Sequence, residues 1–252
     1  MSRPVLLALL VVLGFALAGC TVLESEPTRE DEAVDALADA MAAAEDVETY
    51  EYESDMTVTD GTDSIHASMV GTVDLEGEAA HTIVTYQGET HESYQIGDTT
   101  YRECPDPWGG WGVEHGESDA DWLTGTPLGS HLALLASGDL SYEGVETVDD
   151  RETVHLVGSP PPSEFDDDAS GGTSPLDFGG PSVDDVTVEI WLDAETDLPV
   201  KATVEFEVSE RGETVTSTVT TTFGAYDETE SVELPHEVAD DARDDGCPGA
   251  AP

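Results

Sequence analysis

The sequence DVTVEIWLDAETDLPVKATVEFEV, residues 185–208, decides the fold class. Apolar and polar residues alternate along it with a period of two, first over residues 186–192 and again over residues 200–208. Such alternation is typical of a strand with one buried face, and the polar segment between the two runs is typical of a hairpin turn. Residues 185–208 therefore predict two antiparallel strands whose shared apolar face must pack against something.

The same alternation extends along most of the chain. TVTSTVTTTF, residues 214–223, predicts a third strand, and further strands are expected between residues 50 and 104 and in residues 140–158. Glycine and aspartate pairs mark the turns between them, as at Asp149-Asp150. A last short strand is expected at SVELP, residues 231–235. The chain therefore reads as mainly antiparallel β.

Two helices are predicted, at residues 29–46 and 126–137. Thr28 can cap the first and Thr126 the second. The apolar stripe expected on the first helix consists of Val34, Leu37, Met41 and Ala44. Because only these two helices are available to cover a one-faced sheet, the sequence predicts an α+β fold. In it a strongly curved antiparallel sheet wraps around the N-terminal and mid-chain helices or around a cavity.

The chain begins with a leader that is typical of exported proteins. One positive charge, Arg3, precedes an apolar run over residues 5–18, which is short for a membrane-spanning helix. LAGC, residues 17–20, resembles the lipobox of lipoproteins. The resemblance implies that residues 1–19 are removed and that Cys20 carries a lipid anchor. The alternative is an uncleaved helical anchor, and both place the remaining chain on the extracellular face of the cell membrane.

The chain is very acidic, with 57 acidic residues against 7 basic ones. Once Arg3 leaves with a leader that has no acidic residue, 57 acidic and 6 basic residues give 51 excess negative charges. This charge destabilises a compact state in dilute salt, whereas at molar salt the Debye length falls to about 3 Å. An acidic disordered chain would be poor in aromatic and β-branched residues. The acidity resembles that of proteins from halophilic archaea, and the lack of a basic patch excludes a nucleic-acid partner.

Two cysteines remain once Cys20 is assigned to lipid. An even number in an exported chain predicts a disulfide between Cys104 and Cys247. The seven histidines are scattered singly, and the sequence has no H-E-x-x-H pair, no G-x-S-x-G elbow and no phosphate loop. We therefore expect no catalytic residue, no metal site and no cofactor.

The order of the predicted elements resembles the LolA/LppX-like lipoprotein-carrier superfamily. The likeness covers about residues 30–238 and rests on VEIWLDAETDLPVKATVEF (188–206), YEGVETVDDRETVHLVG (142–158) and FGAYDETESVELP (223–235). It implies a half-open β-barrel whose concave side, partly covered by helices, holds lipid or acyl chains. The anchored members are the closer analogy, and the identity of their ligands is not carried over.

The resemblance suggests a simple division of the chain. Residues 1–19 are expected to be a signal peptide and residues 20–28 a lipidated tether. Residues 29–240 would form a single LolA/LppX-like domain, within which residues 158–183 are a long flexible acidic loop. Residues 241–252 would be a C-terminal tail.

The expected function is that of a monomeric, membrane-anchored extracytoplasmic lipoprotein without enzymatic activity. It would bind a hydrophobic or lipid-like ligand in a half-barrel cavity, where each buried methylene contributes about 0.8 kcal/mol. The residues expected to line this cavity are Met56, Leu128, Leu132, Leu135, Val188, Val204 and Phe206. The alternative left open is a structural or sensory cell-surface lipoprotein with a filled core and no ligand.

Overall fold

The computed structural model describes residues 28–105, 107–116, 122–162, 183–210, 213–244 and 246–247. The predicted signal peptide, Cys20 and the tether up to residue 27 lie outside the described residues. Residues 163–182 of the predicted loop also lie outside them, while residues 158–159 and 183 belong to strands.

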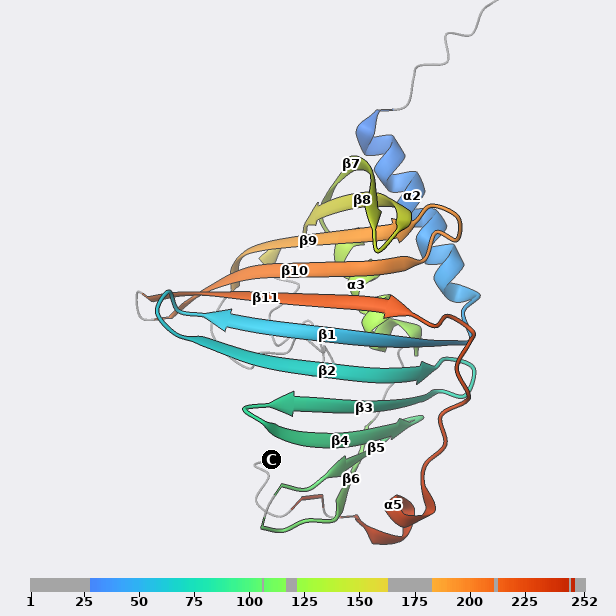
Figure 1. The fold of residues 1–252 in the computed structure, drawn as a ribbon, viewed down its shortest axis with the longest axis vertical. Helices are drawn as coiled ribbons and strands as arrows, with labels where there is room; N and C mark the ends of the chain where they lie inside the picture. The colour runs from blue at the N-terminus through green and yellow to red at the C-terminus, as the bar shows by residue number, and fades with distance from the viewer. Residues whose placement is uncertain are drawn as a thin grey trace, which may run out of the picture.

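A sheet of twelve strands forms the body of the described chain (Figure 1). The strands are β1 (Thr49–Thr59), β2 (Ser64–Asp74), β3 (Ala79–Tyr86), β4 (Glu89–Ile96), β5 (Thr99–Glu103), β6 (Trp111–His115), β7 (Asp139–Val148), β8 (Arg151–Ser159), β9 (Val183–Asp193), β10 (Pro199–Glu210), β11 (Glu213–Gly224) and β12 (Ala242–Arg243). Their order is β12-β6-β5-β4-β3-β2-β1-β11-β10-β9-β8-β7, so β12 and β7 are the edges and the sheet is not closed. Neighbours pair antiparallel except β12 and β6, which pair in parallel. The predicted mainly antiparallel, half-open sheet is confirmed.

The turns between the strands are built by residues suited to them. β7 and β8 join through Asp149 and Asp150, both with positive φ (48° and 65°), as a two-residue hairpin turn of type I′ requires. Between β9 and β10, the Asp193 carboxylate accepts hydrogen bonds from the backbone N–H groups of Glu195 and Thr196. The hairpin predicted from residues 185–208 therefore closes locally, as its sequence indicates.

Three α-helices occur in the described chain: α2 (Arg29–Glu45), α3 (Pro127–Ala136) and α5 (His236–Asp241). Thr28 caps α2 as predicted, because its hydroxyl accepts from the Asp31 backbone N–H at 3.1 Å while the Asp31 carboxylate accepts from the Thr28 N–H at 3.0 Å. The Thr28 backbone N–H and hydroxyl, which both donate to the Asp31 carboxylate, lower the pKa of Asp31. Thr126 caps α3 by accepting from the Gly129 N–H. Both predicted helices are confirmed.

The main hydrophobic core lies on the face of the sheet that α2 and α3 cover, here called the inner face. The sheet curves around α3, which lies behind the strands in Figure 1, and α3 packs against β7, β8, β9 and α2. Core residues with at most 2% exposure include Ala33, Ala40, Ala44, Tyr50, Val73, Leu128, Leu132, Leu135, Leu156, Val188, Ile190, Leu192, Ala202, Val204 and Phe206. Burial of each large apolar side chain contributes roughly 1.5–3 kcal/mol.

The predicted apolar stripe of α2 is partly wrong. Leu37 and Ala44 are buried as expected, but Val34 and Met41 are 53% and 44% exposed. The buried face is instead made mostly of alanines, whose small side chains let the helix approach α3 and β7 closely. The apolar pattern predicted the helix correctly, but it placed the buried face on the larger residues instead of on the alanines.

Beyond β3 the buried face of the sheet changes to the opposite side, here called the outer face. Tyr94 on β4 and Val113 on β6 share this side and are 9% and 7% exposed. Burial raises the pKa of Tyr94, and the carboxylates of Glu92 and, on α5, Glu237 raise it further. α5 therefore lies near Tyr94, and its Val238 is buried. We call Tyr94, Trp111, Val113 and Val238 the outer core.

The segment after β11 runs past the ends of the strands to α5 (Figure 1). The strand predicted at residues 231–235 is wrong, since these residues have no regular structure. The Val232 N–H donates to the Asp74 carboxylate instead of a neighbouring strand, and Pro235 has no N–H to offer before α5 begins.

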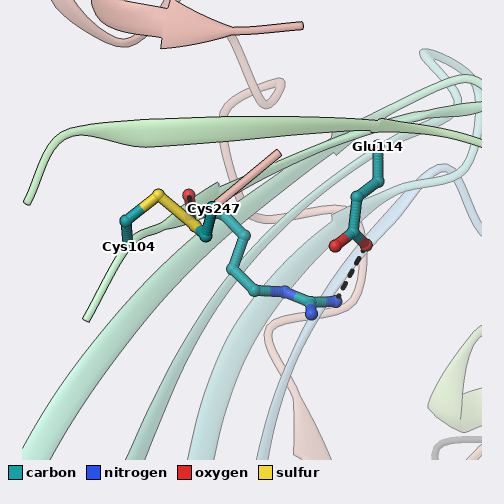
Figure 2. Close-up of a disulfide and its surroundings, with 4 residues drawn as sticks. Cys104, Glu114 and Cys247 are labelled. Carbon is teal, nitrogen blue, oxygen red and sulfur yellow. Dashed lines mark hydrogen bonds and ion pairs between the residues drawn. A yellow bond between two sulfur atoms is a disulfide. The ribbon is translucent and has the colours of Figure 1, made fainter. Parts of the chain in front are cut away.

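The predicted disulfide is confirmed, between Cys104 and Cys247 with their Cα atoms 5.3 Å apart (Figure 2). It links the end of β5 to the chain that follows β12, so the last described residues wrap the β6 edge of the sheet. The Arg102 guanidinium and the Glu114 carboxylate form an ion pair of 3.5 Å close by. The disulfide holds α5 and β12 in place as a cover for this edge.

Candidate functional site

The inner face has a part that the helices cover and a part that they leave open. We call the open part the open shelf; its residues are Met56, Val58, Ile65, Ala67, Met69, Val84, Tyr86, Val208 and Val215. Strand registers place them on one surface, since Met56 pairs with Ala67 and Ala67 with Tyr86. Ile65 and Tyr86 are 45% and 41% exposed. The open shelf is therefore an apolar surface continuous with the core and only partly buried.

Hydroxyl groups on β1 and β3 line one part of the border between the open shelf and the helix-covered core. Tyr52 lies across Gly71, where an added Cβ would stand only 2.5 Å from the tyrosine ring. Its hydroxyl makes a 3.1 Å hydrogen bond with Thr82 and donates to the Met69 sulfur at 3.4 Å. Burial raises the pKa of Tyr52, so the phenol stays neutral and keeps its hydrogen bonds with Thr82 and Met69.

The seven residues predicted to line a ligand cavity fall into two groups. Leu128, Leu132, Leu135, Val188, Val204 and Phe206 are at most 2% exposed and belong to the core. Met56 is half-buried and belongs to the open shelf. The two groups meet on one row of the sheet, where Val204 pairs with Val219 and Val219 with Met56. Their lining of a ligand cavity stays a prediction.

Sequence reasoning did not select the other open-shelf residues as a binding surface. Ile65 and Met69 carry the same period-two signal as the buried strands, and that signal does not distinguish a covered strand from an uncovered one. Tyr86 is the residue whose type indicates an uncovered surface. It is a large aromatic residue next to a hairpin turn, with an apolar ring and a polar hydroxyl group.

Two buried polar atoms of the inner face have no hydrogen-bond partner within the described chain. Ser217 is 3% exposed and lies between Val58 and Phe206 in the strand register. The His131 Nδ1 atom donates to the Pro127 carbonyl at 2.6 Å and leaves Nε2 unpaired. Burial lowers the pKa of His131, so its imidazole is neutral. Each such atom costs about 1–3 kcal/mol when left unpaired.

On the outer face, a cavity of about 480 Å³ lies over β11, β1, β2 and β3. Its lining combines the carboxylates of Glu51 and Glu53 with Val70, His81 and Ile83. It therefore opens on the side of the sheet opposite to the open shelf. Its mixed, open lining fits a solvated hollow in a twisted sheet better than a container for an apolar chain.

The histidines of the outer face have structural contacts. His155 lies between the carboxylates of Glu146 (3.1 Å) and Glu189 (3.0 Å), and its ring stacks on Trp191 with centroids 4.5 Å apart. The Lys201 ammonium lies 4.5 Å from the same indole ring. These stacked and paired groups stabilise a solvent-facing sheet surface.

The described residues also bear on two other kinds of site. Within them, no three histidine, cysteine or acidic side chains gather closely enough to hold a metal ion. None of the helices in the described part of the chain has the length and apolar character needed to cross a bilayer.

Comparison with known proteins identifies the fold. No protein-family model matches the chain, and no curated protein is similar to it in sequence. The structure is similar to lipoprotein LppX of Mycobacterium tuberculosis, with a TM-score of 0.51 and 15% identity over 80% of this chain and 98% of that one. It is equally similar to LprF of Mycobacterium bovis, with a TM-score of 0.51 and 13% identity over 83% and 99%. At these identities the likeness concerns the fold.

Proposed function

We propose that this protein is a membrane-anchored lipoprotein that binds a hydrophobic or lipid-like ligand on the open shelf, without catalysis. The observation that carries the proposal is the continuity of the open shelf with the buried core, across the row Val204, Val219 and Met56. An apolar chain laid along the open shelf extends a core that is already formed. About ten buried methylenes would contribute roughly 8 kcal/mol before the costs of association, comparable to the free energy of micromolar binding.

The fold supports this proposal. LppX is a lipoprotein with a similar fold. Binding on the concave side of a half-open sheet is the function that the sequence resemblance to the lipoprotein-carrier superfamily implies. We further propose that Cys20 carries the lipid anchor, that the domain faces the outside of a halophilic archaeal cell, and that it works as a monomer. The high negative charge supports the salt-rich setting, because it is compatible with folding where charges are screened.

One observation favours the alternative of a structural or sensory lipoprotein with no ligand. Six of the seven predicted cavity residues, three on α3 and three on β9 and β10, are buried in the inner core, where they already pack with protein. The two functions differ only in what the open shelf contacts, so the experiment must address that surface.

The test is ligand capture with paired variants. The protein would be extracted at molar salt, and any co-purified lipid identified by mass spectrometry. Binding of a fluorescent fatty acid would then be compared in Ile65→Glu and in Val70→Glu. Both residues lie on β2 with similar exposure, 45% and 42%, but Ile65 is on the open shelf and Val70 on the outer face. We expect at least tenfold weaker binding for Ile65→Glu and no change for Val70→Glu.

Two results would contradict the proposal: no lipid in the wild-type sample together with no binding of the probe, or equal loss in both variants. The anchor is tested separately with Cys20→Ser, which should move the protein from the membrane fraction to the soluble fraction. Retention in the membrane fraction would favour the uncleaved helical anchor.

A further inference from the structure

A cavity of about 380 Å³ lies at the end of α2, away from the open shelf. It is an open pocket lined by the last turn of α2, the turn between β2 and β3, and the short 3₁₀ helix η1 (Leu123–Gly125). Its lining residues are Ala44, Glu45, Val47, Leu75, Glu78, Trp122 and Leu123. Ala44 and Val47 are buried, whereas Glu45 and Glu78 are exposed, so the cavity has an apolar floor and an acidic rim.

The electrostatics of this cavity favour a cation. The C-terminal end of a helix carries about half a negative charge, which basic side chains usually offset. The last turn of α2 contains no basic residue, and Glu45 adds a carboxylate there. Glu78 brings a second carboxylate from the β2–β3 turn, and no lining residue is basic. Without a ligand, both carboxylates lie near the C-terminal end of α2, which is also negative, so their charges are not compensated there.

Trp122 and the floor decide which kind of cation fits. A metal ion of the calcium class needs six to eight oxygen ligands, whereas this cavity offers two carboxylates beside an indole ring and aliphatic side chains. Aromatic rings attract alkylated ammonium groups through their electron-rich faces, and aliphatic walls contact the methyl groups of such ions. The Trp122 Nε1 atom is buried and has no hydrogen-bond partner within the described chain. The volume is that of a small-ligand pocket.

We propose that this cavity binds a small organic cation with an alkylated ammonium group. Glu45 and Glu78 supply the counter-charge, Trp122 the aromatic contact, and Ala44 and Val47 the apolar floor. The site does not depend on the open shelf, so its ligand is a second ligand of the same domain.

The test is a titration with tetramethylammonium chloride at constant ionic strength, with potassium chloride as the balancing salt. The protein would carry ¹⁵N-labelled tryptophan, and its four tryptophans (Trp108, Trp111, Trp122 and Trp191) give four indole N–H signals. Trp122→Phe assigns the signal of the cavity. We expect that signal to move saturably with tetramethylammonium, and not with tert-butanol, a neutral solute of similar shape.

Matched variants make the test specific. Replacing both rim carboxylates, Glu45→Gln with Glu78→Gln, should weaken binding about tenfold, as expected for the loss of two nearby charges. Glu76→Gln removes a charge from the same turn without touching the cavity lining, and it should leave binding unchanged. Far-ultraviolet circular dichroism confirms that each variant is folded.

The proposal is overturned if the Trp122 signal does not saturate, if tert-butanol binds as tightly as tetramethylammonium, or if Glu76→Gln weakens binding as much as the rim pair does. An equal response of the Trp108 signal, on the exposed loop between β5 and β6, would also overturn it by showing a nonspecific salt effect.

Discussion

The sheet is buried in two different ways along its width. On β7, β8 and β9 the inner face packs against α2 and α3, whereas on β4 and β6 the buried side chains Tyr94 and Val113 lie on the outer face, near α5. On β5 and β6 the inner side chains Arg102 and Glu114 are more than half exposed. Both regions show the same alternation of polar and apolar residues. The alternation of polar and apolar residues therefore indicates that one face of a strand is buried. Which face of the sheet this is depends on the segment that packs against it.

The two covers are also held in different ways. α2 and α3 have 17 and 10 residues, side-chain caps and many aliphatic contacts, so packing alone keeps them on the sheet. α5 has six residues and no side-chain cap, and a helix of this length is not stable by itself. We therefore expect the outer core to depend on the disulfide that follows α5, and the inner core not to depend on it.

Removing the disulfide should change stability most among these variants, and it should affect the outer core before the inner core. The cysteines are 143 residues apart, for which the chain-entropy model gives about 4–5 kcal/mol of stabilisation. In Cys104→Ala with Cys247→Ala, we expect the free energy of unfolding to fall by up to this amount. Amide hydrogen exchange should accelerate first in β5, β6 and α5, and last in β9 and β10.

Reduction of the wild-type disulfide at molar salt is the control, since it breaks the same bond without a change of sequence. Equal acceleration of exchange across all strands would contradict the comparison, because it would make the outer core part of one cooperative unit with the inner core.

Truncation of a buried leucine in the inner core should cause the next largest loss of stability. Leu135 is fully buried between α3 and the sheet, with its side chain directly above Gly158. Leu135→Ala should lower the free energy of unfolding by about 3 kcal/mol, the usual cost of a buried leucine. Chemical denaturation at molar salt measures it.

Val34→Ala, on the exposed side of α2, is the matched control and should change stability by less than about 0.5 kcal/mol. Similar losses in the two variants would show that α2 and α3 do not cover the inner face as described.

Local signals in the sequence predicted much of this fold. The hairpin over residues 185–208 and the caps Thr28 and Thr126 depend on neighbouring residues alone, and they form as predicted. The disulfide followed from counting cysteines. The strand predicted at residues 231–235 does not form. Pro235 has no N–H to donate, and the Val232 N–H donates to the Asp74 carboxylate, 158 residues away in the sequence.

The candidate site was predictable only in part, for the same reason. Met56 and Val204 were placed on one apolar face, and the strand register confirms that they share it. Whether a residue on that face is covered or open depends on where α3 docks, which no local pattern contains. The cavity at Trp122 was also missed, because its lining comes from three segments that are distant in sequence.

The smallest effect should come from His131, a buried titratable side chain of the inner core that is 3% exposed. Its pKa is lowered from 6.5 by burial, so the folded protein keeps it neutral while the unfolded chain takes up a proton as pH falls below that value. The free energy of unfolding should therefore decrease from pH 7 toward pH 5.5, and this residue accounts for less than about 1 kcal/mol of the decrease by pH 6. His131→Gln removes this dependence, and the difference between the two pH profiles isolates His131 from the other histidines. Parallel profiles would mean that His131 takes up its proton equally in the folded and unfolded states, which would contradict its burial without a partner for Nε2 in the described chain.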